Sequence, residues 1–212
     1  MPLDNRIERM IRDQLLARGI KDSKVLEAFR SIPREHFVEG ALKEQAYSDY
    51  PLPIGYGQTI SQPYIVALML SALSLTGNER VLEIGTGSGF QTALLSKLAK
   101  KVYSIERVHG LVVFAKRMID KLEIHNVLIK FGDGTLGWAA EAPFDRIIIS
   151  AGAPKIINEL VKELSPGGKM LVPTGDEDHQ ELKLFTKEAS GITEQNLGGC
   201  RFVKLIGKYG WK

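Results

Sequence analysis

The stretch VLEIGTGSGF, residues 81–90, decides the fold. An apolar strand pattern runs into Gly85, Gly87 and Gly89, and a helix-forming segment follows at once. Glycines allow a sharp turn and a close approach of a ligand to the backbone, beside the N-terminus of the following helix. The spacing is G-x-G-x-G, with Phe90 where a dinucleotide-binding loop would have its last glycine. The stretch therefore predicts a cofactor loop that departs from the dinucleotide pattern.

Acidic residues stand at the ends of three successive predicted strands. Glu83 lies two places before the first glycine, where its carboxylate would repel a pyrophosphate but suits a ligand's ammonium group. Glu106 ends KVYSIE and can accept hydrogen bonds from both ribose hydroxyls, and Asp133 in GDGTLGW can accept from an adenine amino group. Any one of these acids alone could be a solvated residue or a helix cap. Together with the glycine loop they predict S-adenosylmethionine, which carries an ammonium, a sulfonium and no phosphates.

Outward from this loop, short apolar strands alternate with helices. The predicted strands read RVLEIG, KVYSIE, NVLIKFG, FDRIIIS and GKMLVPT, with helices near 88–99, 108–122 and 155–164 between most of them. This alternation is typical of an α/β fold with a doubly wound, mostly parallel sheet and helices on both faces. The later segments ELKLFTKE and CRFVKLIG predict an antiparallel addition at the C-terminal end.

The first 76 residues have a helical pattern instead. A first helix ends at Gly19, a second is capped by Asp22, and a third is capped by Ser61. The apolar faces of the first and third are Ile7, Met10, Ile11 and Leu15, and Ile65, Leu68, Met69 and Ala72. Because no flexible linker is visible, we predict one domain over 1–212. In it, residues 1–76 form a helical cover with a substrate loop, and 77–212 form the Rossmann-like core with its C-terminal strands.

Composition limits the classes of partner. Hydrophobic residues make up 44% and charged residues 25%, and the net charge of +3 comes from Lys and Arg interspersed with acids, so no nucleic-acid partner is expected. A single cysteine, Cys200, excludes an internal disulfide and fits a reducing compartment. The N-terminal segment is charged from its fourth residue, and the apolar run 65–75 is too short to span a bilayer. We expect a cytoplasmic protein with no membrane partner.

Several other chemistries find no support in the sequence. Amino-group methylases commonly carry an Asn/Asp-Pro-Pro-Tyr/Phe loop after the fourth strand, where this chain has the small, uncharged SAGAP, residues 150–154. Cys200 is expected to pack rather than act as a nucleophile. The four histidines have no metal-ligand spacing, and DEDH, residues 176–179, is expected to be a solvated turn. No metal site is predicted.

At this point the chain resembles the protein-L-isoaspartate O-methyltransferase family along nearly its whole length. The matching segments are IPREHF, AYSDYPLPIGYGQTISQPY, VLEIGTGSGF, VYSIER, GDGTLGW, FDRIIISAGAP, LSPGGKMLVPTG and RFVKLIG. The glycine and acid motifs alone indicate a class I S-adenosylmethionine-dependent methyltransferase. GQTISQP, residues 57–63, is more specific, because generic members of that class lack it. One departure is Lys204, where the family's strand has proline.

The resemblance implies methyl transfer from S-adenosylmethionine, giving S-adenosylhomocysteine, to the free α-carboxylate of L-isoaspartyl residues in damaged proteins and peptides. The ester then forms a succinimide that partly returns to normal aspartyl, so the implied role is protein repair. Because a free carboxylate has a pKa near 3.9, the nucleophile is ionised at neutral pH and needs no general base. We expect the enzyme to be a monomer, and the preference for residues flanking the isoaspartate is left open.

The resemblance also assigns the site residues. It places the catalytic serine at Ser61, and Gly55 and Gly57 would fold the loop across the cofactor so that Thr59 and Ser61 face the carboxylate. The substrate-binding residues expected are Thr59, Ile60, Ser61 and Val203. The cofactor-binding residues expected are Gln58, Thr59, Glu83, Gly85, Thr86, Gly87, Ser88, Gly89, Glu106, Arg107, Asp133 and Gly134.

Two alternatives remain open from the residues alone. One is a class I methyltransferase that acts on another carboxylate, a small molecule or RNA. The other is a non-catalytic module that binds S-adenosylmethionine. Such a module would keep Glu83, Glu106 and the glycines but has no reason to keep a hydroxyl-bearing loop at 58–61.

Overall fold

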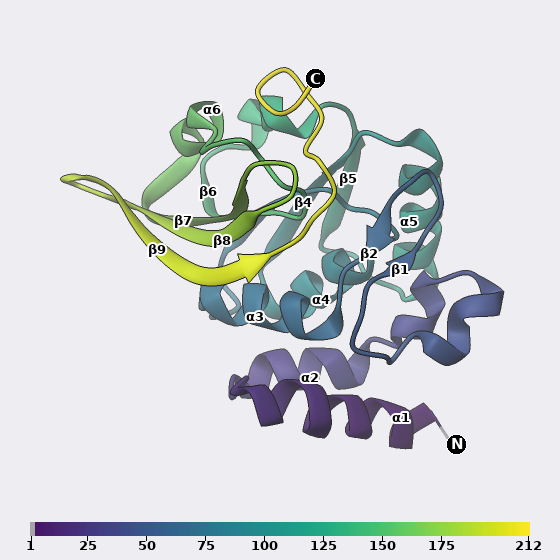
Figure 1. Cartoon of the computed structure of the whole chain (residues 1–212). Coiled ribbons are helices and arrows are strands. Elements are labelled where there is room, and N and C mark those ends of the chain that lie inside the picture. The colour runs from purple at the N-terminus through teal and green to yellow at the C-terminus, as the bar shows by residue number, and fades with distance from the viewer. Residues whose placement is uncertain (1–2) are drawn as a thin grey trace.

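The centre of the molecule is a twisted sheet with helices on both sides (Figure 1). The structure is a computed structural model that describes residues 3–212, with side chains from Asn5 onward. Within these residues the main sheet has seven strands in the order β5-β4-β3-β6-β7-β8-β9. Their bounds are β3 Arg80–Ile84, β4 Lys101–Glu106, β5 Val127–Phe131, β6 Phe144–Ile149, β7 Leu164–Gly175, β8 Gln180–Glu188 and β9 Gly191–Cys200. The pairings are parallel from β5 to β7, and β8 and β9 are added antiparallel.

Alternate residues of the core strands serve two separate hydrophobic clusters, because successive side chains in a strand point to opposite faces. Val81 packs with α3 Pro63–Leu73, α4 Phe90–Leu98 and α5 His109–Lys121 in the larger cluster. Its neighbour Leu82 faces the smaller cluster with α6 Asn158–Lys162. The predicted doubly wound sheet is thereby confirmed. The helix predicted near 155–164 is shorter than expected, since β7 already begins at Leu164.

The N-terminal helices form an outer layer. Figure 1 shows α1 Leu3–Met10 and α2 Ser23–Ser31 below α3 and α4. The predicted apolar face of the first helix is buried, and the chain continues past α1 in a π-helical turn to Leu15. Asp22 caps α2 as predicted, accepting hydrogen bonds from the amides of Lys24 at 2.9 Å and Val25 at 3.2 Å. Cover and sheet share one hydrophobic cluster. The single domain over 1–212 stays a prediction.

The third helix differs from its prediction in two respects. It begins after Gln62, which caps it without a side-chain hydrogen bond, so the prediction of a Ser61 cap is wrong. Because Pro63 occupies the first helical position, the helix starts one residue later than a Ser61 cap requires. The predicted apolar stripe is also wrong. Met69 is buried, but Ile65, Leu68 and Ala72 are only half-buried, and the buried set is Pro63, Val66, Ala67, Met69, Leu70 and Leu73.

At the C-terminal end, the predicted strand CRFVKLIG is wrong. The partner of β8 is β9, residues 191–200, which pairs with it from Glu188↔Gly191 to Gln180↔Cys200. Most of β9 is exposed, so it carries no apolar alternation that a pattern could detect. The segment after it runs over the end of the sheet and joins the loop after β6 through an isolated bridge between Gly152 and Lys204. Cys200 is half-buried and packs against the larger core cluster.

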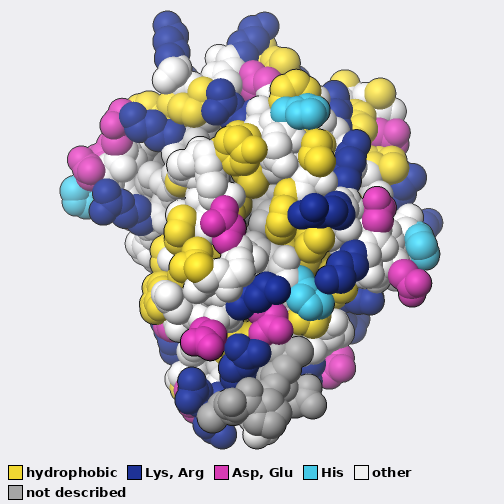
Figure 2. Space-filling model, turned by 90° about the vertical axis from the view of Figure 1, so that its right-hand side faces the viewer, with side chains coloured by type: hydrophobic (Ala, Val, Ile, Leu, Met, Phe, Trp, Pro, Cys, Tyr) yellow, Lys and Arg dark blue, Asp and Glu magenta, His cyan; other side chains and the backbone are white. Residues whose placement is uncertain are grey.

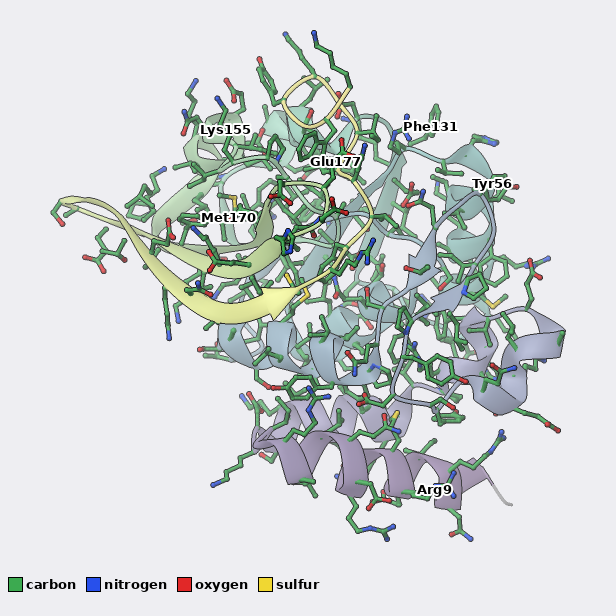
Figure 3. All side chains as sticks on the ribbon, in the orientation of Figure 1. Arg9, Tyr56, Phe131, Lys155, Met170 and Glu177 are labelled. Atoms are coloured by element: carbon green, nitrogen blue, oxygen red, sulfur yellow. The ribbon has the colours of Figure 1, made fainter. Side chains whose placement is uncertain are left out.

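A small two-stranded hairpin, separate from the main sheet, precedes α3 in the chain. Its strands are β1 Leu52–Pro53 and β2 Thr59–Ile60. The turn between them has three consecutive left-handed residues, Gly55, Tyr56 and Gly57, with φ of 84°, 53° and 68°. Tyr56 lies at the tip of this hairpin (Figure 3). None of the helices in the described chain is long and apolar enough to cross a membrane.

Candidate active site

A pocket lies at the carboxyl ends of the parallel strands β3, β4 and β6. Chain order reverses beside β3, whose neighbours are β4 and β6, and open α/β sheets bind ligands at such a point. The pocket has a volume of about 780 Å³, including the solvent at its mouth. Most of its walls come from four places: the hairpin residues 58–61, the glycine loop 84–88, the ends of β4 and β6, and the C-terminal segment 203–206. The remaining lining residues are Val66, Phe90, Gln91 and Gly134. Of the predicted site residues, all but Glu83, Gly89 and Asp133 line it.

The glycine loop forms the floor beside the helix α4. Gly87 has φ of 56°, a left-handed conformation that L side chains rarely adopt. A Cβ atom at this position would lie 3.3 Å from Cδ1 of Ile54, under the hairpin. Gly87 lines the pocket without a side chain, so a ligand can approach its backbone closely.

Glu106 is a buried carboxylate at the end of β4, only 6% exposed. Its two oxygens accept hydrogen bonds from the backbone amides of Gly87 at 2.9 Å and Val108 at 2.8 Å. A carboxylate has about four lone-pair positions, so each oxygen keeps one for a further donor. The side chain thus fixes the glycine loop and can still accept hydrogen bonds from two ribose hydroxyls.

Glu83 is buried beneath the residues that line the pocket, and its direct contact with a ligand stays a prediction. It is fully buried and accepts hydrogen bonds from Gln91 at 3.0 Å, Thr92 at 2.5 Å and Ser104 at 2.6 Å. Burial raises the pKa of its carboxyl to about 7, against the opposing effect of these three donors. Gln91 lines the pocket and also donates to Ser150 at 2.7 Å, so Glu83 acts on the pocket through this amide.

Asp133 does not line the pocket either, because its carboxylate is hydrogen-bonded to other parts of the chain. One carboxylate oxygen accepts from the amide and hydroxyl of Thr135, and the other accepts from the amide of Lys208 at 2.8 Å. These bonds lower the pKa of Asp133, against a desolvation effect that raises it. The carboxylate therefore ties the C-terminal loop to the turn after β5, and its neighbour Gly134 is the residue that reaches the pocket. Contact between Asp133 and an adenine amino group stays a prediction.

Gly89 is the third predicted site residue that does not line the pocket. It lies on the side of the glycine loop that faces α5. It caps α4 and faces Ala115 of α5, where a Cβ atom would come within 3.2 Å. Its role in the structure is to let α4 pack closely against α5. A direct cofactor contact by Gly89 is therefore not supported.

The hairpin and the C-terminal segment form the outer walls. Ile60 is buried, whereas Thr59 is exposed and Ser61 is half-buried. Neither hydroxyl has a hydrogen-bond partner among the described residues, so both are free to bind a ligand. Val203 is held in place because its carbonyl accepts from the amide of Gly152 at 2.8 Å.

The sequence that forms this pocket matches the model of a known protein family. The model for protein-L-isoaspartate(D-aspartate) O-methyltransferase matches residues 5–210. The chain belongs to this family. Family membership makes it an S-adenosylmethionine-dependent methyltransferase, as the resemblance of its motifs implied.

Relatives of this family cover almost the full chain. The protein-L-isoaspartate O-methyltransferase of Desulfosudis oleivorans is 54% identical over 207 residues, 98% of this chain and 94% of its own length. That of Geobacter metallireducens is 51% identical over 212 residues, 100% of this chain and 98% of its own. The sequence-based identification of the family and its activity is thereby confirmed.

Solved structures of the family have the same fold. One protein-L-isoaspartate O-methyltransferase has a TM-score of 0.87 at 29% identity, covering 96% of this chain and 67% of its own. A Plasmodium falciparum protein assigned to the same activity, in complex with S-adenosyl-L-homocysteine, has a TM-score of 0.82 at 27% identity, covering 97% of this chain and 99% of its own. The predicted class I methyltransferase fold is confirmed.

Sequence reasoning missed several residues of the methyltransferase pocket. Gln91 and Ser150 connect the buried Glu83 to the cavity, and Phe90 and Leu205 supply apolar walls. In the sequence, Phe90 signals only the absence of a glycine. Ser150 is the last residue of the predicted strand FDRIIIS, the position that identified Glu106 on its own strand, so the same criterion could have found it. Gln91 gave no signal, because a polar residue in the first turn of a helix is usually solvated.

Proposed function

We propose that the protein holds S-adenosylmethionine over the glycine loop and methylates the free α-carboxylate of L-isoaspartyl residues entering between the hairpin and the C-terminal segment. The observation that carries this proposal is that residues 58–61 and 84–88 line one pocket. The bare glycine backbone, the apolar Ile84 and Ile105, and the carboxylate of Glu106 together suit a nucleoside with no phosphates.

The residues present suit a reaction that needs no base. When bound, S-adenosylmethionine supplies an electrophilic methyl group on its sulfonium. The substrate carboxylate is already ionised at neutral pH, and the protein's task is to align its oxygen with that methyl. We assign this alignment to the hydroxyls of Thr59 and Ser61, with Ile60 and Val203 bounding the peptide. Alignment of this kind can contribute up to roughly 7–11 kcal/mol.

Cofactor contacts are assigned to the residues that form the loop side of the pocket. These are Gln58, Thr59, Gly85, Thr86, Gly87, Ser88, Glu106, Arg107 and Gly134. Glu83 and Gly89 support this set from behind, as their burial and packing indicate. The hydrogen bonds of Glu83 to Gln91, Thr92 and Ser104 hold the floor of the cofactor site in one arrangement.

Family membership supports proteins and peptides as partners. Figure 2 shows one face on which Lys and Arg side chains are separated by hydrophobic and acidic ones instead of forming a basic stripe. Tyr56, Val113 and Phe131 are the most exposed large hydrophobic residues of the described chain, at 68%, 56% and 56%. A monomeric state and a cytoplasmic location stay predictions from the sequence.

A pair of matched peptides tests the substrate assignment. We expect methyl transfer from labelled S-adenosylmethionine to a short isoaspartyl peptide, and none above background to its normal aspartyl twin. Equal activity on both twins, or activity confined to a small molecule or RNA, would contradict the proposal. A folded protein that binds the cofactor but methylates neither twin would support the non-catalytic alternative.

Ser61→Ala is expected to lower kcat/KM on the isoaspartyl peptide about tenfold, roughly 1.4 kcal/mol of barrier. Stability should stay within about 0.5 kcal/mol of the original, because Ser61 does not cap α3 and the hydroxyl bonds to no described residue. The measurements are steady-state kinetics and thermal unfolding. Cofactor affinity should change much less than kcat/KM.

Ser96 offers a matched control. It is another half-buried serine, outside the pocket, whose hydroxyl donates to the carbonyl of Ala93 at 2.7 Å. Ser96→Ala should leave kcat/KM unchanged. If both alanine variants lose the same activity, or neither loses any, Ser61 has no special role in catalysis.

A further inference from the structure

Lys204 occupies a fixed place on the substrate wall of the pocket. Its neighbours bind Gly152 on both sides: the carbonyl of Val203 accepts from the Gly152 amide at 2.8 Å, and the Leu205 amide donates to the Gly152 carbonyl at 2.9 Å. These bonds hold the backbone of residues 203–205 against the loop after β6. Lys204 itself lines the pocket.

The ammonium group of Lys204 stands at the rim. Its side chain is 43% exposed, and Nζ lies 2.7 Å from Oε1 of Glu177, itself 55% exposed. The ammonium also lies 5.8 Å from the centre of the Trp211 ring. Figure 3 shows Glu177 on the turn between β7 and β8, beside the C-terminal segment. The cation is therefore held on the exposed side of the pocket wall by its pair with Glu177.

The other charged residues of the described lining come from the end of β4. They are Glu106, whose oxygens hold two backbone amides, and the adjacent Arg107. Lys204 is thus the one charged side chain of the described lining that lies on the C-terminal wall. A peptide entering along this wall meets a single positive charge, and an acid of the peptide could replace Glu177 as its partner.

We propose that Lys204 determines specificity for isoaspartyl peptides that carry an acidic residue close to the isoaspartate, with Glu177 competing for the same ammonium. This inference rests on the proposed function. The flanking residue is a better partner than the reacting carboxylate, because the cation is held at the rim. A cation bonded to the nucleophilic carboxylate would also stabilise its charge and weaken its attack. Exposed ion pairs have small energies, so the expected preference is about threefold to fivefold.

The test uses isoaspartyl peptides that differ only by Glu or Gln at each of two positions on either side of the isoaspartate. The readout is the ratio of kcat/KM for the Glu peptide to that for its Gln twin. We expect a ratio of about three to five at one or more positions at low salt, decreasing as salt screens the pair. The ratio is internal to each variant, so a general loss of activity does not affect it.

Three variants separate the outcomes. Lys204→Met keeps an unbranched side chain without the charge and should bring the ratio to about one, whereas Lys204→Glu should bring it below one. Glu177→Gln removes the competitor and should raise the ratio. Equal ratios in the original protein and both Lys204 variants would overturn the proposal. Failure of the proposed function is different, because the protein would then methylate none of the isoaspartyl peptides.

Discussion

Gly87→Val is expected to weaken S-adenosylmethionine binding by at least about 100-fold, roughly 2.7 kcal/mol. Two effects combine at this position. Valine is β-branched and would have to adopt φ near 56°, and its Cβ atom would lie 3.3 Å from Cδ1 of Ile54. The glycine loop, which lines the pocket, would have to shift to relieve both. Calorimetric titration with S-adenosylmethionine or S-adenosylhomocysteine measures the loss directly.

Gly167 provides the control for backbone strain alone. It has φ of 75°, is exposed, lies outside the pocket, and has no neighbouring atom within 4 Å of the place that a Cβ atom would take. Gly167→Val should therefore lose stability through similar strain and keep its cofactor affinity. Normal affinity in a folded Gly87→Val variant would mean that the cofactor does not lie over the glycine loop.

The parallel core could be predicted because each of its strands and helices has a recognisable pattern within its own short stretch of sequence. Strands buried on both faces, such as RVLEIG and FDRIIIS, are nearly continuous apolar runs, and helices of the usual length separate them. The edge strand β9 could not be predicted in this way. It has no buried face, and its position depends on pairing with β8. The segment 201–207 has the apolar residues of a strand because Val203 and Leu205 pack against the smaller hydrophobic cluster of the sheet.

The cofactor side of the site could be predicted to the level of residue position but not of contact. Strand ends identify which residues lie near a ligand, and Glu106 lines the pocket as that argument expects. Glu83 points to the α4 side of the sheet, because alternate strand residues point to opposite faces. There it accepts hydrogen bonds from Gln91 and Thr92 of α4 and from Ser104 of the neighbouring strand β4. These contacts depend on how α4 and β4 pack against β3, which a pattern within one strand does not reveal.

The substrate side depended on a family motif. No periodicity in GQTISQP indicates a pocket wall, and the local interpretation of Ser61 as a helix cap is wrong. The hairpin turn takes three left-handed residues in succession, and residues 58–61 after it line the pocket. That geometry is a tertiary outcome, in which packing of Ile54 and Ile60 into the core orients the loop.

Glu106→Ala is expected to weaken cofactor binding about 10- to 150-fold, corresponding to the 1.5–3 kcal/mol of hydrogen bonds to a charged group. The carboxylate is buried at the pocket wall, and its loss removes acceptors for the ribose hydroxyls. The same substitution releases the amides of Gly87 and Val108, so the glycine loop also loses a support. Calorimetric titration gives the affinity, and circular dichroism shows whether the fold is kept.

Glu163 separates the two contributions of Glu106. It too is a buried carboxylate, 8% exposed, that accepts from a backbone amide, that of Trp138 at 2.9 Å, but it does not line the pocket. Glu163→Ala should therefore lose stability as Glu106→Ala does and retain cofactor affinity. Equal affinity losses in the two variants would mean that Glu106 acts through folding alone. An unchanged affinity in folded Glu106→Ala would exclude it as the ribose ligand, and the cofactor would have to be held by the remaining walls of the pocket.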